Sequence, residues 1–115
     1  MKFLFAAALA LGLSGAAAAA EAAADPKLDF LGYCITQGSS SSYCACVADK
    51  LGAALTPAEL AVYNDYLRQI GAGQQDAAKL IDELTVRHAI SKKDLGRILK
   101  AATDITANPE TCAGL

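Results

Sequence analysis

The residues of this sequence that could do chemistry are its four cysteines and its single histidine. Cys44 and Cys46 flank one alanine, Cys34 lies a short segment earlier, and Cys112 lies near the end of the chain. As thiolates, Cys44 and Cys46 could join His88 as soft ligands of a metal ion, as in a copper carrier. As disulfides, the four cysteines would instead cross-link a small exported domain.

The N-terminal segment favours disulfides because it has the pattern of an export signal. Lys2 provides a positive start, Leu4 to Leu13 form a short apolar run, and Ser14-Gly15 ends that run. An alanine run follows and offers A-x-A cleavage sites such as Ala18-Ala19-Ala20. The apolar run is too short to span a bilayer.

We therefore predict a cleaved secretory signal peptide over residues 1–20, with a cleavage site that could be as late as residue 24. Residues 25–115 are predicted to form a single helical domain, which is periplasmic or secreted. Because such compartments are oxidising, all four cysteines are expected to be paired.

Helix geometry limits how the cysteines can pair. Residues two apart in a helix differ by about 200° around its axis, so Cys44 and Cys46 cannot bond to each other and cannot easily share one ion. Cys34 and Cys44 lie on either side of a predicted turn, which favours Cys34–Cys44 and Cys46–Cys112. The alternative, Cys34–Cys46 with Cys44–Cys112, stays open at this stage. We predict no metal site, since there is no C-x-x-C motif and no second histidine.

Five short helices are expected to position these residues. Their starts are marked by Asp25-Pro26, one serine of Ser39–Ser42, the capping box Thr56-Pro57-Ala58-Glu59, Gln75, and a second box-like sequence at Ser91-Lys92-Lys93-Asp94. No segment alternates with the period of a strand. The prediction is an all-α fold, a small disulfide-stapled antiparallel bundle of four to five short helices.

Apolar stripes at helical spacing predict which residues face the core. The first helix would carry Leu28, Leu31, Cys34 and Ile35, with Phe30 four residues before Cys34. Tyr63 and Tyr66 lie beside the stripe of the third helix. They are expected at the edge of the core, or alternatively in an exposed aromatic patch that binds a partner.

Catalysis and nucleic-acid binding are not supported by the remaining residues. The vicinal carboxylates Asp82 and Glu83 would diverge by about 100° on a helix, and no nucleophile or phosphate-binding motif is present. The chain has a net charge of −2, and its sequence lacks the basic patch that nucleic-acid binding requires. We predict that the protein is not an enzyme, needs no cofactor and has no membrane span.

These observations favour a small helical binding or accessory protein of the bacterial periplasm that contacts another periplasmic or envelope protein. One alternative is a carrier of a small ligand or metal ion between its helices. Another is a periplasmic stress chaperone, which would resemble the small acid-activated helical chaperones in size, compartment and helicity.

Overall fold

The computed structural model describes residues 25–115, so the predicted signal peptide and its cleavage site lie outside the described residues. In the described part there are five helices and no strand, which confirms the all-α prediction. The helices are α2 (Pro26–Thr36), α3 (Ser41–Ala54), α4 (Pro57–Gly71), α5 (Ala77–His88) and α6 (Lys92–Thr106). None of these helices is long and apolar enough to cross a membrane.

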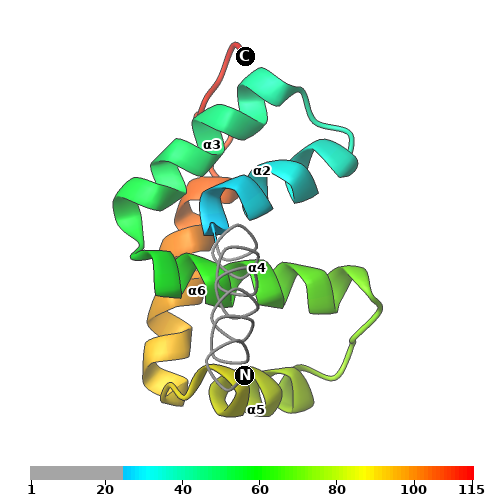
Figure 1. The fold of residues 1–115 in the computed structure, drawn as a ribbon, viewed down its shortest axis with the longest axis vertical. Coiled ribbons are helices and arrows are strands. Elements are labelled where there is room, and N and C mark those ends of the chain that lie inside the picture. Colours follow the sequence, from blue (N-terminus) through cyan, green and yellow to red (C-terminus); the bar gives the residue numbers. More distant parts are fainter. Residues whose placement is uncertain (1–24) are drawn as a thin grey trace, which may run out of the picture.

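The helices are arranged as a hairpin at one end and a helix pair at the other (Figure 1). α2 and α3 run antiparallel and are joined by residues 37–40. α4 crosses the middle of the molecule, where it contacts α2 on one side and α5 and α6 on the other. α6 also reaches α3, so α4 and α6 together connect the two ends. The largest fully buried side chains come from α3 to α6: Val47, Leu51, Leu60, Leu84, Leu95 and Ile98.

Side-chain caps begin four of the five helices where the sequence predicts them, whereas α5 begins at Ala77 behind the N-cap Asp76 and not at Gln75. Asp25 accepts hydrogen bonds from the first backbone N–H groups of α2, and Ser40 accepts one from Tyr43 N at the start of α3. The capping box of α4 is complete, because Thr56 Oγ1 accepts from Glu59 N at 3.1 Å and Glu59 Oε1 accepts from Thr56 N at 2.9 Å. The predicted second box is only half formed. Ser91 caps α6, but no reciprocal bond from Asp94 is present.

The inward face of α2 differs from the prediction. Leu28 is 62% exposed and Ile35 is 42% exposed, whereas Phe30 is the one fully buried residue of this helix. The physical reason is that the Cys34–Cys44 disulfide and the Phe30 ring are anchored against α3 and the core, and this fixes the rotation of the helix. Leu28 and Ile35 consequently point outward.

Candidate functional site

The two disulfides hold the hairpin end of the molecule together. Cys34 is bonded to Cys44 with a Cα–Cα distance of 5.7 Å, which joins α2 to α3. Cys46 is bonded to Cys112 with a Cα–Cα distance of 5.9 Å, which ties the C-terminal tail to α3. This is the connectivity that the sequence favours. Because every cysteine is in a disulfide, none offers a thiolate to a metal ion.

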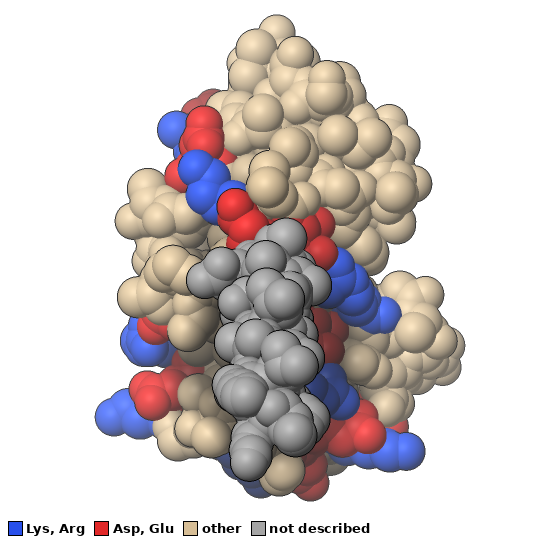
Figure 2. All heavy atoms as spheres, viewed as in Figure 1, with Lys and Arg blue, Asp and Glu red and all other residues tan. Residues whose placement is uncertain are grey.

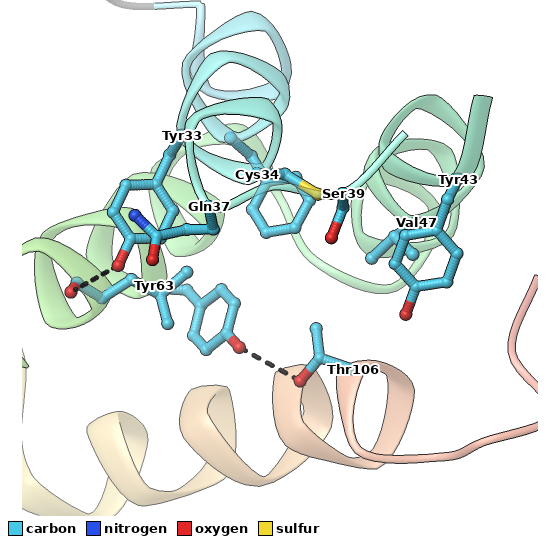
Figure 3. Close-up of a pocket in the computed structure, with 10 residues that line it drawn as sticks. Tyr33, Cys34, Gln37, Ser39, Tyr43, Val47, Tyr63 and Thr106 are labelled. Carbon is cyan, nitrogen blue, oxygen red and sulfur yellow. Dashed lines mark hydrogen bonds between the residues drawn. The ribbon is translucent and has the colours of Figure 1, made fainter. Parts of the chain in front are cut away.

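A cavity of about 200 Å³ lies beside the Cys34–Cys44 bridge, between α2, α3, α4 and the end of α6 (Figure 3). We call it the tyrosine cavity because Tyr33, Tyr43 and Tyr63 contribute to its wall from three different helices. The other lining residues are Phe30, Cys34, Gln37, Ser39, Val47, Leu67 and Thr106. None of the lining residues carries a charge.

The hydroxyl groups around the tyrosine cavity differ in how they are satisfied. Tyr33 Oη donates to the Leu67 carbonyl oxygen at 3.3 Å, and Tyr63 Oη shares a hydrogen bond of 3.1 Å with Thr106 Oγ1. Burial raises the pKa of the Tyr63 phenol, so this group stays neutral. Tyr43 Oη makes no hydrogen bond to any other described residue, and its ring points toward the space between α3 and α6 (Figure 3).

One segment around the cavity is also without charge. Between Asp29 and Asp49 the sequence has no Lys, Arg, Asp, Glu or His. These residues, 30–48, form the second part of α2, the connecting turn and the first part of α3, and we call them the uncharged end. Figure 2 shows no charged atoms on this face at the upper right, where the connecting turn of the hairpin lies, while charged side chains appear at the other side of the hairpin, over the middle and at the opposite end.

The charged side chains of the rest of the molecule largely pair with one another. Asp65 on α4 makes the most buried of these contacts, since its side chain is only 16% exposed. It accepts hydrogen bonds from Arg87 at 2.6 and 2.7 Å, and its Oδ2 lies 2.7 Å from His88 Nε2. Burial acts to raise the pKa of Asp65, but the hydrogen bonds from Arg87, His88 and Gln69 outweigh it and hold this pKa below its ordinary value.

The structure brings the predicted candidate residues together only in part. His88 contacts Asp65, and Cys44 and Cys46 are both in disulfides, so these three residues do not form a ligand set. No group of three His, Cys, Asp or Glu side chains in residues 25–115 could hold a metal ion. Asp82 makes a surface ion pair with Lys92 at 3.4 Å.

Tyr63 and Tyr66 have different surroundings. Their rings stack with centroids 6.1 Å apart. Tyr63 is 3% exposed and belongs to the core, whereas Tyr66 is half-buried and lines a second cavity of about 280 Å³ between α4, α5 and α6. Tyr63 could therefore meet a partner only from inside the tyrosine cavity.

Sequence reasoning missed Tyr33 and Tyr43, which complete the tyrosine cavity. They lie on different helices, and no local pattern relates them to Tyr63. The long interval without charge between Asp29 and Asp49 was the available signal, because both tyrosines lie within it.

No protein-family model matches the chain, and comparisons with curated proteins and with solved structures give no match.

Proposed function

We propose that this protein is an exported helical binding protein of the bacterial periplasm, which acts by contact with another periplasmic or envelope protein and catalyses no reaction. The contact surface in this proposal is the uncharged end, residues 30–48. The observation that carries it is the coincidence, at one end of the molecule, of a charge-free surface, three tyrosines and an open cavity.

The composition of the uncharged end supports this proposal. The cores of protein interfaces are depleted in charged residues and enriched in tyrosine. Ile35 is 42% exposed there, and Tyr33 and Tyr43 are half-buried at the cavity wall. No ion pair of the described residues involves residues 30–48, so binding at the uncharged end desolvates no charged side chain of that segment.

The disulfides support the same proposal through rigidity. Cys34–Cys44 fixes the hairpin and Cys46–Cys112 holds the tail beside it. A surface that is already ordered loses little conformational entropy on binding. Disulfides are also typical of proteins in oxidising compartments, which agrees with export to the periplasm.

Site-specific photo-crosslinking in cells tests the proposal. A photoreactive phenylalanine would replace Ser41, which is exposed in the uncharged end, or Lys79, which is exposed near the start of α5 at the other end. We expect a discrete crosslinked species with the probe at residue 41 and none with the probe at residue 79. Crosslinking only at residue 79 would refute the assigned surface, and no crosslink at either position would refute the function.

A small-ligand carrier is the second candidate, because the tyrosine cavity could enclose a molecule. Its volume of about 200 Å³ is below the roughly 300–1,000 Å³ of typical ligand pockets. A carrier that binds a metal ion through cysteine thiolates is not supported, because all four cysteines are in the two disulfides. Size therefore favours a protein partner.

A further inference from the structure

The size of the tyrosine cavity defines what can enter it. A cavity of about 150 Å³ in an apolar protein interior accommodates one benzene molecule. At about 200 Å³ the tyrosine cavity has room for one six-membered ring with a small substituent. It has no room for a nucleotide or a larger cofactor. The volume thus corresponds to a single aromatic side chain.

The electrostatics of the cavity define the charge of its occupant. None of its lining residues is charged, and the surrounding residues 30–48 carry no charge either. A cationic or anionic group would lose hydration on entry and meet no counter-charge, which is strongly unfavourable. The occupant must therefore be neutral.

The surface chemistry of the wall suits an aromatic ring. Phe30, Val47 and Tyr63 are nearly completely buried and offer apolar and aromatic contacts. Aromatic rings pack favourably edge-to-face or offset against one another, beyond the gain from the buried area alone. The hydroxyl of Tyr43, one of the lining residues, has no partner among the described residues and remains able to donate a hydrogen bond.

We propose that the tyrosine cavity receives one neutral single-ring side chain, Phe or Tyr, of the protein partner, as the anchor of the interface. This inference rests on the proposed function, because it identifies which chemical group of the partner is bound. An aromatic anchor inserted in a desolvated pocket is the usual form of an energetic hot spot.

The first experiment uses the side-chain analogues toluene and p-cresol as probes, with the oxidised protein followed by two-dimensional amide NMR. We expect saturable shifts confined to Phe30, Tyr33, Val47, Tyr63 and their neighbours, with a dissociation constant on the order of 1 mM, as is usual for so few atoms. Benzylammonium and benzoate should bind at least tenfold more weakly. Absence of shifts with both neutral probes, or equal binding of the charged probes, would overturn the proposal.

The second experiment fills the cavity from its rim. Ser39 lines the cavity from the turn and makes no side-chain hydrogen bond to another described residue, so Ser39→Trp would place a ring inside. Ser42→Trp is the matched control, because Ser42 is exposed on α3 and does not line the cavity. Gln37→Trp, at the other side of the opening, is a second filling variant in case Ser39→Trp does not fold.

The filling variants are expected to reduce toluene and p-cresol binding at least tenfold and to abolish the crosslink from residue 41. Ser42→Trp should leave both unchanged. If the neutral probes bind but the filling variants keep the crosslink, the anchor proposal is wrong while the proposed function stands. If the probes bind and no crosslinked partner exists, the cavity takes free small molecules and both proposals are wrong.

Discussion

Cys44 and Cys46 lie two residues apart on α3 and are bonded to two different segments of the chain. Cys44 is completely buried and bonded to Cys34 on α2, whereas Cys46 is half-buried and bonded to Cys112 in the tail. The helix rotation between them, about 200°, is what separates their partners. One turn of α3 is thereby fixed on two sides, and this turn also forms part of the wall of the tyrosine cavity through Tyr43 and Val47.

The first prediction tests the orientation of α2. Replacing Phe30 by Ala should destabilise the protein by about 3 kcal/mol or more, because it removes the only fully buried side chain of this helix. Leu28→Ala should change stability by less than about 0.5 kcal/mol, since Leu28 is 62% exposed. Urea unfolding with the disulfides intact measures both. A larger loss for Leu28→Ala than for Phe30→Ala would mean that the leucine face packs inward.

The sequence predicted the helices well because their signals are local. Caps at Asp25, Thr56 and Ser91 act within one helical turn, so the residues that determine each helix start are adjacent in the chain. The rotation of α2 was not predictable in this way. Leu28, Leu31 and Ile35 have the spacing of one helix face. Phe30 and Cys34 lie on another face of the same helix, and packing against α3 and α4 determines which of the two faces is buried.

The candidate site was predictable only in outline. The helix excluded only a Cys44–Cys46 bond, and the turn between Cys34 and Cys44 favoured the observed connectivity over the alternative. The tyrosine cavity depends on four helices meeting, and the contact of Asp65 with His88 joins residues 23 positions apart. Neither relationship leaves a periodic pattern in the sequence.

The second prediction concerns the carboxylate of Asp65. Its pKa is lowered in the folded protein, so it stabilises the fold above its ordinary pKa of about 3.8, and this contribution is lost as the pH falls through the lower folded value. Asp65→Asn should cost about 1.5–3 kcal/mol near pH 7, the range for hydrogen bonds to charged groups. The difference between the variant and the wild type should disappear at strongly acidic pH.

Unfolding by urea at pH 7, 4 and 2.5 checks this expectation. Asp82→Asn is the control, because Asp82 is 66% exposed in its contact with Lys92 and should change stability by less than about 0.5 kcal/mol. A constant difference between Asp65→Asn and wild type at all three pH values would contradict the assigned role. Acid-induced exposure of apolar surface in the same series, detected by dye binding, would support the stress-chaperone alternative.

The third prediction concerns Asn64, the neighbour of Asp65 on the buried side of α4. Its Nδ2 donates to the Pro26 carbonyl oxygen at 2.9 Å, and its Oδ1 is buried without a hydrogen-bond partner among the described residues. Asn64→Asp would replace the donor with a buried carboxylate, which cannot donate a hydrogen bond to the Pro26 carbonyl oxygen. A cost of about 3–5 kcal/mol at neutral pH is expected for a buried charge without compensation.

The pH dependence of Asn64→Asp should have the opposite sign to that of Asp65. Burial raises the pKa of a carboxyl above its unfolded value of about 3.9, so the destabilisation is present at neutral pH and is relieved as the pH falls through the raised value. Asn64→Ala is the control, since it removes the hydrogen bond to Pro26 without adding a charge. If both variants lose the same stability at every pH, residue 64 is accessible to water.

The last prediction tests the longer disulfide through Cys112→Ser. The chain-entropy model gives about 4 kcal/mol for a loop of 66 residues, against about 3 kcal/mol for the 10-residue loop of Cys34–Cys44. The variant should lose up to that amount, while α4 to α6 keep their own caps and stay helical by circular dichroism. The freed Cys46 thiol is half-buried, so it should react with alkylating reagents and form dimers under oxidising conditions.

The rate and position of alkylation separate the two connectivities. If Cys112 were instead bonded to Cys44, the freed thiol would be completely buried and would react only on unfolding. Cys46→Ser combined with Cys112→Ser is the control, because it should show the same loss of stability without dimers. A Cys112→Ser variant that stays monomeric, has no titratable thiol and keeps the wild-type melting temperature would show that Cys46 and Cys112 are not partners. Rapid alkylation mapped to Cys46 is the expected result, because α3 turns this side chain away from the buried Cys44 and toward the tail.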